Sequence, residues 1–137
     1  MSGLNLEIIT PSKSAFNGKI KAITVPGSKG RFQVLINHAP IISTFEIGMI
    51  KVDLPDEKPN YYATAGGTIE VLDNKVLVLA DSIEEVSEID EERALKAKQR
   101  AEERLSAKNS KINIARAEAA LARANNRIQI KEKYKQS

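Results

Sequence analysis

The chain has 137 residues, of which 42% are hydrophobic, with no cysteine, no tryptophan and a formal net charge of +3. This length suits one or two small domains, and the absence of cysteine excludes disulfide scaffolds and cysteine-based metal or thiol chemistry. The longest apolar run falls far short of the roughly 20 residues of a membrane span, and no export signal is visible at the start, so we expect a soluble intracellular protein.

Glycine and proline divide the chain into two parts of different character. All seven glycines lie at or before Gly67, and all five prolines lie at or before Pro59. Both residue types interrupt regular backbone structure, because glycine adopts positive φ readily and proline lacks an amide donor. We therefore expect a first part that turns often and a second part that runs in long elements.

Short strands are predicted throughout the first part. Alternating apolar and polar residues from Leu4 to Ile8 predict a half-buried strand, and Asn17-Gly18 is interpreted as the turn after it. Further strands are expected at residues 20–25, 32–36, 49–54, 61–65, 68–72 and 75–80, with Asp73-Asn74 as a hairpin loop between the last two. Many short strands without a helical period predict an antiparallel β-sandwich or flattened barrel over residues 1–84.

From Asp90 onward the apolar period becomes helical. One series contains Ala94, Ala97, Ala101 and Leu105, and a second contains Ile114, Ala117, Leu121, Ala124 and Ile128. Lys108-Asn109-Ser110 forms a short connector, which predicts an antiparallel hairpin of two helices of about twenty residues each within residues 85–137. The predicted fold class is therefore α+β, with a hairpin whose alanine-rich seam buries little apolar area and is only marginally stable.

Charge is distributed unevenly in the helical part. The net charge is zero up to Ser82, −3 over residues 83–104 and +6 from Leu105 to the end. Six arginines form two triples with the same i, i+7, i+11 spacing: Arg93, Arg100 and Arg104, then Arg116, Arg123 and Arg127. Such spacing places each triple on one helical face.

The two arginine triples differ in their local partners. Glu92 precedes Lys96 by four positions and Glu103 follows Arg100 by three, which favours ion pairs within the first helix. No carboxylate stands three or four positions from any arginine of the second triple. The second face is either an idle basic surface or binds an anion, and the anion would come from the acidic first helix, from phosphates or from an acidic patch on another protein.

Several motifs resemble those of one known family. Ile89-Asp90-x-x-Arg93-Ala94 resembles the I/L-D-x-x-R-A nucleotide motif in the epsilon subunit of bacterial F-type rotary ATP synthases. Similar segments are the opening LNLEIITPSKSAFNG, the loop Asn37-His38-Ala39-Pro40, the Gly66-Gly67 and Glu70-Val71 stretch, and the AEAALARANNR segment at 117–127. The chain departs from the family pattern at Arg31, Gln33 and Ile36, around the loop that by this resemblance would contact the membrane ring.

The resemblance implies a non-catalytic subunit of the central rotor stalk of a proton-translocating ATP synthase. The sandwich would rest on the gamma subunit and the c-subunit ring, peripherally at the cytoplasmic face of the bacterial membrane. The helical pair would fold down on the sandwich or extend into the alpha/beta catalytic head and inhibit ATP hydrolysis. ATP would be a regulatory ligand that favours the folded-down form, and no other cofactor is implied.

The resemblance also implies two sets of functional residues. The nucleotide would bind Glu84, Ile89, Asp90, Arg93, Ala94, Arg100, Arg123 and Arg127. Partner subunits would contact Arg31, His38, Ala39, Pro40, Arg116 and Lys131. Asp90 has an alternative role as the N-cap of the first helix, since an aspartate there accepts hydrogen bonds from first-turn amides.

Other functions find less support in the residues. His38 is the only histidine, so neither a metal site nor a Ser-His-Asp set is expected, and Gly27-Ser28-Lys29-Gly30 lacks the spacing of a P-loop. An independent enzyme is therefore not expected, and neither is nucleic-acid binding or insertion into the membrane. The alternative is a free-standing adaptor that senses nucleotides or polyanions and is attached to no motor.

Overall fold

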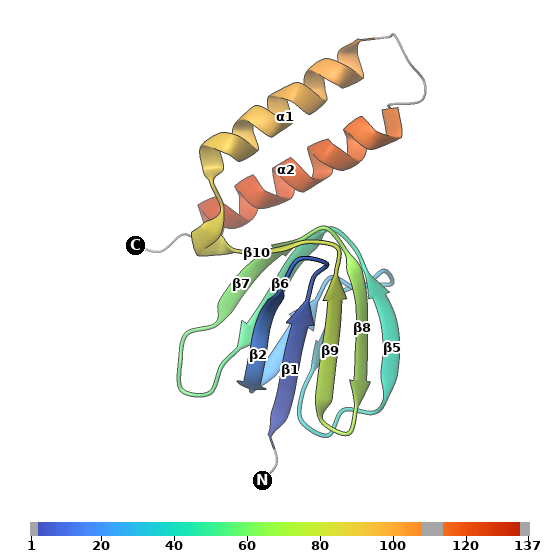
Figure 1. Cartoon of the computed structure of the whole chain (residues 1–137), viewed down its shortest axis with the longest axis vertical. Coiled ribbons are helices and arrows are strands. Elements are labelled where there is room, and N and C mark those ends of the chain that lie inside the picture. The colour runs from blue at the N-terminus through green and yellow to red at the C-terminus, as the bar shows by residue number, and fades with distance from the viewer. Residues whose placement is uncertain (1–2, 108–113, 135–137) are drawn as a thin grey trace. The chain divides into compact units, whose positions relative to one another are not determined.

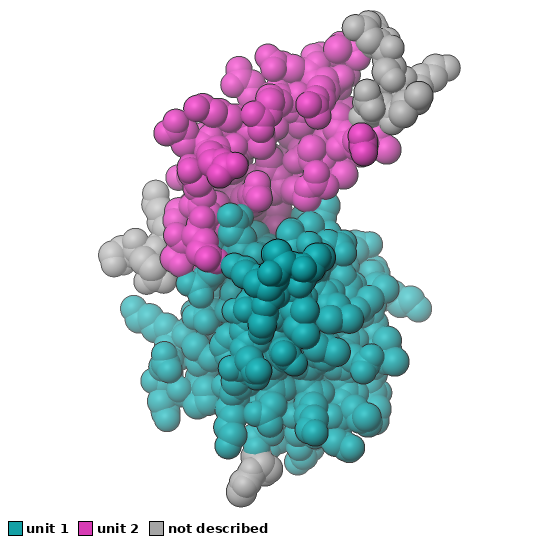
Figure 2. Space-filling view, in the orientation of Figure 1, with its two compact units in different colours: residues 1–85 teal, residues 86–137 magenta. Residues whose placement is uncertain are grey.

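The computed structural model describes residues 3–107 and 114–134 and divides into two compact units, Met1–Glu85 and Val86–Ser137 (Figures 1 and 2). The first unit contains the strands β1 (Leu4–Ile9), β2 (Ser14–Ile20), β3 (Ala22–Val25), β4 (Phe32–Val34), β5 (Ile41–Phe45), β6 (Gly48–Asp53), β7 (Asn60–Thr64), β8 (Gly67–Leu72), β9 (Lys75–Ala80) and β10 (Ile83–Glu85). The second contains the 3-10 helix η1 (Val86–Glu88) and the α-helices α1 (Glu91–Ser106) and α2 (Ile114–Tyr134). The predicted α+β class, a sandwich followed by a helical hairpin, is confirmed.

The first unit is a sandwich of two five-stranded sheets. Their strand orders are β2-β1-β9-β8-β5 and β10-β7-β6-β3-β4. Neighbouring strands are antiparallel with one exception, the parallel pair of β1 and β9, in which Asn5 lies opposite Lys75 and Ile9 opposite Leu79. The first strand of the sandwich therefore depends on a strand some seventy positions later for one of its two neighbours.

The core lies between the two sheets and consists of branched aliphatic side chains. In β1, Leu4, Leu6 and Ile8 are buried while Asn5 is exposed, as the alternation predicts. The same pattern buries one face of the other long strands, including Ile23, Val25, Ile50, Val52, Ile69, Val71, Val76 and Val78. Each such side chain contributes about 1.5–3 kcal/mol on full burial, so the sandwich has a substantial core without tryptophan.

The predicted turn at Asn17-Gly18 is wrong. Both residues lie inside β2, with Asn17 opposite Glu7 and Gly18 opposite Leu6. The chain reverses earlier, where the Thr10 amide donates to the Lys13 carbonyl at 2.9 Å and the Lys13 amide donates to Thr10 Oγ1 at 3.2 Å. The buried Thr10 hydroxyl stabilises this turn by its hydrogen bonds. Gly18 has an ordinary strand conformation, so its presence does not indicate a turn.

Besides β2, where a turn was expected, two more strands were not predicted, and β4 is shorter than predicted. Strand β5 follows Pro40 and has no strict alternation, and β10 has only three residues. Strand β4 ends at Val34 because the next residues form a turn, in which the His38 amide donates to the Leu35 carbonyl at 3.2 Å and Asn37 has a φ of 63°. Leu35 and Ile36 are consequently exposed on a loop instead of continuing the strand.

The β8–β9 hairpin agrees with its prediction. Asp73 and Asn74 have φ angles of 50° and 62°, as a two-residue turn with two left-handed positions requires. At the other end of β8, Gly67 lies so close to β9 that a Cβ atom would overlap the Leu79 carbonyl oxygen. That glycine is needed for the close approach of the two strands.

In the second unit, α1 and α2 pack side by side and run in opposite directions (Figure 1). The predicted alanine seam is present, with Ala94 and Ala101 of α1 and Ala117 and Ala124 of α2 buried. Ile114 was expected in the same series but is 46% exposed, since it stands at the very start of α2. α1 has 16 residues, fewer than predicted, and the predicted connector Lys108-Asn109-Ser110 lies outside the described residues.

Candidate functional site

The helical unit contains a cleft lined by basic side chains from both helices. Its volume is about 400 Å³. Its lining residues are Ala97, Arg100 and Arg104 of α1 and Ala120, Arg123, Ala124 and Arg127 of α2. The alanines and arginines have separate roles here. The short alanine side chains let the two helices approach each other, and the long arginine side chains form the walls of the cleft.

The cleft brings together three of the arginines predicted to bind nucleotide. Arg100, Arg123 and Arg127 come from two helices and line one space. Arg104 joins them, although it was not predicted as a site residue. The signal that could have found it was the shared i, i+7, i+11 spacing, since the last member of each triple then faces the same way as the one before it.

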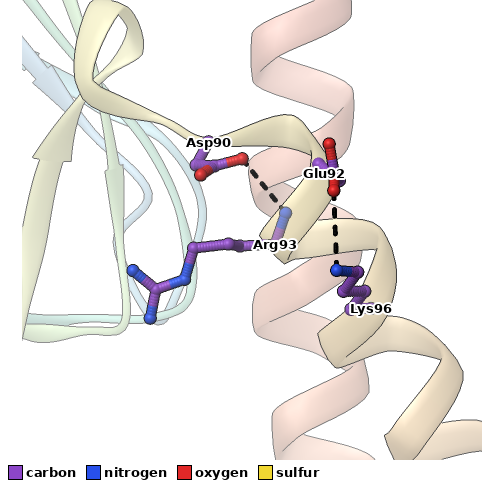
Figure 3. A network of polar contacts seen from close by, with 4 residues as sticks. All are labelled: Asp90, Glu92, Arg93 and Lys96. Carbon is purple, nitrogen blue, oxygen red and sulfur yellow. Dashed lines mark hydrogen bonds and ion pairs between the residues drawn. The ribbon is translucent and has the colours of Figure 1, made fainter.

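Within the described residues, three of the four cleft arginines have no ion-pair partner. Among the described residues, no carboxylate lies within 4.0 Å of the Arg100, Arg104 or Arg123 guanidinium groups. The expected pair of Arg100 with Glu103 is therefore not formed, whereas Lys96 and Glu92 do pair at 3.5 Å (Figure 3). Guanidinium groups stay charged and present forked donors that fit phosphate or carboxylate oxygens, so this cleft can bind a compact polyanion.

Asp90 caps the first helix. Its Oδ1 accepts a hydrogen bond from the Arg93 amide at 3.1 Å, and its φ and ψ of −91° and 102° are those of an N-cap (Figure 3). The capping role proposed for Asp90 is thus confirmed. Contact of the same carboxylate with a nucleotide base stays a prediction.

The remaining predicted nucleotide residues lie outside the lining of the cleft. Arg93 is exposed on the first turn of α1, while Ile89 and Ala94 are buried with 4% and 1% of their surface accessible. Glu84 belongs to β10 of the sandwich unit, where it lies opposite Ala63 of β7. The described cleft is formed by the helical unit alone, and the role of these four residues stays a prediction.

The predicted partner residues of the sandwich fall at opposite ends of one strand. Arg31 precedes β4 and donates from Nη1 to the Met49 carbonyl at 3.1 Å. His38 follows β4, and its Nδ1 lies 2.7 Å from the carbonyl oxygen of Ala39, which is exposed together with Pro40. Strand β4 thus separates the two groups along the chain, and their contact with partner subunits stays a prediction.

The predicted partner residues of α2 also differ from each other. Arg116 is exposed near the start of the helix. Lys131 is partly buried near its end and donates from Nζ to the Val86 carbonyl at 3.0 Å. In this structure Lys131 is thus engaged within its own unit.

Across residues 3–107 and 114–134, no group of three or more histidine, aspartate or glutamate side chains gathers as metal ligands would. Neither α1 nor α2, over the residues described, has the length and hydropathy of a membrane-crossing helix.

Comparison with protein families finds two matching models that together cover almost the whole chain. The β-sandwich domain of the ATP synthase delta/epsilon chain matches residues 3–86. The long α-helix domain of the same chain matches residues 87–132. The division between the two models falls within two residues of the division between the structural units.

Relatives of similar length share much of the sequence. The ATP synthase epsilon chain of Desulforamulus reducens is 42% identical over 127 residues, which cover 93% of this chain and 96% of the relative. The ATP synthase epsilon chain of Syntrophomonas wolfei is 40% identical over 128 residues, 93% of each chain.

Solved structures share the fold. A chain in the cryo-EM structure of the Euglena gracilis mitochondrial ATP synthase OSCP/F1/c-ring superposes with a TM-score of 0.80 at 22% identity, over 92% of this chain and 79% of that one. A chain of the Tetrahymena thermophila mitochondrial ATP synthase central stalk/c-ring gives a TM-score of 0.62 at 14% identity, over 95% and 97%.

Proposed function

The chain belongs to the ATP synthase delta/epsilon family as an epsilon chain, and on this premise we propose that it is a rotor subunit of the central stalk. It couples the catalytic head of a proton-translocating ATP synthase to the ring in the membrane. It catalyses no reaction itself and regulates the hydrolysis of ATP by the assembled enzyme.

The arginine cleft supports a regulatory nucleotide site. Four guanidinium groups from two helices surround a space of about 400 Å³, and phosphate oxygens are the anions that such donor forks fit best. ATP carries several negative charges on adjacent phosphates, so one molecule can bridge α1 and α2. Bound ATP therefore favours the arrangement in which the two helices lie side by side.

The weak seam makes two arrangements of the helices possible. Alanine pairs bury little apolar area, so a hairpin held by them has a small surplus of stability. A ligand that binds one form at 100 times its dissociation constant stabilises that form by about 2.7 kcal/mol. A full shift from 1:99 to 99:1 requires about 5.5 kcal/mol, so ATP biases the equilibrium and partner contacts provide the rest.

In the extended form the second helix contacts the catalytic head. The basic face of α2, with Arg116, Arg123, Arg127 and Lys131, then lies against acidic helices of the beta subunits and inhibits ATP hydrolysis. The sandwich remains at the gamma subunit and the c-subunit ring, which the loop of His38, Ala39 and Pro40 contacts. The subunit is peripheral to the membrane, at its cytoplasmic face.

Co-purification tests the rotor function against a free-standing nucleotide sensor with the same cleft. A tagged full-length chain expressed in its own cells should co-purify with the gamma subunit and with the alpha and beta subunits. Elution of the chain alone, at physiological salt and with nucleotide present, would refute the rotor assignment and favour the sensor. A sandwich-only chain that ends at Glu85 is the matched control, because it should still bind the stalk.

A further inference from the structure

The helical unit begins with a single 3-10 turn that is held from two sides. In η1 the Ile89 amide donates to the Val86 carbonyl at 3.3 Å and closes the turn. Val86 and Ile89 are each only 4% exposed, and η1 packs against α2. The first residues of the unit are therefore packed although α1 begins only at Glu91.

Lys131 donates to the same carbonyl from the other end of the unit. Its Nζ lies 3.0 Å from the Val86 oxygen, across 45 positions of the chain. The Val86 carbonyl oxygen thus accepts two hydrogen bonds, one from the Ile89 amide and one from the Lys131 ammonium group. Its two lone pairs allow no more than these two. A charged donor in a partly buried place forms a stronger hydrogen bond than a neutral one.

The position of this contact matters because the rest of the helix pair is held weakly. The seam is built of alanines, whereas the last turns of α2 also bury Ile128 and Ile130. Val86 is the first residue of the helical unit, directly after the unit boundary at Glu85. The Lys131–Val86 contact thus ties the end of α2 to the residue at which the second unit starts.

We propose that Lys131 and the Val86 carbonyl form a clasp that must break before α2 can leave its place beside η1 and α1. This inference rests on the proposed function in one respect, the existence of an extended form. In that form the ammonium group of Lys131 is released, so the same side chain is a clasp in one state and a free basic group in the other. Lys131 is accordingly a positioning residue for the hairpin and takes no part in lining the arginine cleft.

Hydrogen exchange of the full-length chain without nucleotide tests the clasp. Lys131→Met removes the ammonium group and keeps an unbranched side chain. Because a charged hydrogen bond is lost, the amides of residues 86–94 and 128–134 should exchange about tenfold faster. Sandwich amides should not change, which shows that the variant is folded.

Two matched variants sharpen the result. Lys133→Met removes an equal charge two positions later, from an exposed lysine whose Nζ lies 5.4 Å from the centre of the Tyr134 ring, and should exchange like the wild type. Lys131→Arg keeps a charged donor and should restore most of the protection. If Lys131→Met exchanges like Lys133→Met, or if Lys131→Arg behaves like Lys131→Met, the clasp is refuted.

The same variants separate the clasp from the proposed nucleotide function. Because exchange is measured without ATP and without partners, a positive result stands even if the chain binds no nucleotide. With ATP present, Lys131→Met should require more nucleotide than wild type to reach the same protection, since a smaller fraction starts in the closed form. If Lys131→Met exchanges faster than the wild type but ATP changes the exchange of neither protein, the nucleotide proposal is refuted and the clasp proposal stands.

Discussion

Asn37 and Asn74 hydrogen-bond to each other through a side chain–side chain and a side chain–backbone contact. Asn74 Nδ2 donates to Asn37 Oδ1 at 3.1 Å, and the Asn37 amide donates to Asn74 Oδ1 at 2.6 Å. Both residues have positive φ, 63° and 62°. The pair thereby anchors the loop that contains His38, and the β8–β9 turn is its anchor.

Two substitutions of Asn74 should separate the contribution of the hydrogen-bonded pair to the free energy of unfolding from the contribution of the positive-φ backbone. Asn74→Gly loses the side-chain contacts but tolerates positive φ, and we expect the free energy of unfolding to fall by about 1 kcal/mol. Asn74→Ala also strains the backbone, and we expect a loss of about 2 kcal/mol. Urea unfolding of the full chain measures both. Equal stability of the wild type and Asn74→Gly would show that the exposed pair contributes nothing.

Gly67 and Gly18 should respond in opposite ways to alanine. A Cβ atom at Gly67 would overlap the Leu79 carbonyl oxygen, so Gly67→Ala should lower the free energy of unfolding by about 3 kcal/mol. At Gly18 a Cβ would meet only the Phe16 ring at 3.7 Å, so Gly18→Ala should be neutral or stabilise by up to about 1 kcal/mol. Thermal unfolding checks the pair. A marked loss at Gly18 would mean that β2 needs glycine for a reason other than space.

Asp90 can be tested for its two roles separately. Asp90→Ala removes the cap and should destabilise α1 by about 1 kcal/mol, whereas Asp90→Ser keeps a capping oxygen and should not. Circular dichroism during thermal unfolding measures the cap, and calorimetry with ATP measures binding. If Asp90→Ser retains helix stability but loses ATP affinity, the carboxylate contacts the ligand. If both are retained, capping is its whole role.

The arginine cleft predicts how ATP affinity divides among the side chains. Arg123→Ala with Arg127→Ala removes two charged donors and should weaken ATP binding to the isolated chain about 100-fold. Arg104→Ala should weaken it about tenfold, although no family motif singled that residue out. Titration calorimetry measures both, with Lys133→Ala as the control for lost charge alone. If both variants bind ATP as tightly as the Lys133→Ala control, ATP does not bind in this cleft.

Removal of the helical unit should relieve inhibition. A chain that ends at Ser87 keeps all ten strands of the sandwich but lacks both α-helices. Reconstituted with the other subunits, it should raise the rate of ATP hydrolysis severalfold, because no basic helix can then enter the catalytic head. Assembly is checked by the amount of gamma subunit recovered. An unchanged rate in a fully assembled complex would contradict the inhibitory role of the helices.

The sandwich was largely predictable because period-two alternation follows directly from burial of one sheet face. Leu4, Leu6 and Ile8 illustrate this, and the Asp73-Asn74 turn needed only its own residue types. The turn at Thr10 was missed because its signal is a side-chain hydroxyl, which the more familiar Asn17-Gly18 pair outweighed. β5 and β10 gave no periodic signal of their own.

The candidate site was predictable only in part. Helical spacing places Arg100 with Arg104 and Arg123 with Arg127, but the register of one helix against the other decides which of them share a cleft. That register depends on alanines such as Ala101 and Ala124, which look alike in a sequence. The contact of Lys131 with Val86 joins residues 45 positions apart and involves a backbone carbonyl, so no pattern of side chains in the sequence could predict it.

The parallel neighbours β1 and β9 also set an order of events during synthesis. β1 is synthesised well before β9 and gains its second partner only when Lys75–Ala80 has emerged. Until then β1 has an open edge inside what will become a sheet, and long-range pairings of this kind form slowly. The nascent chain must therefore finish its sandwich late, shortly before the helices emerge, whereas the hydrogen bonds within each helix join residues only four positions apart.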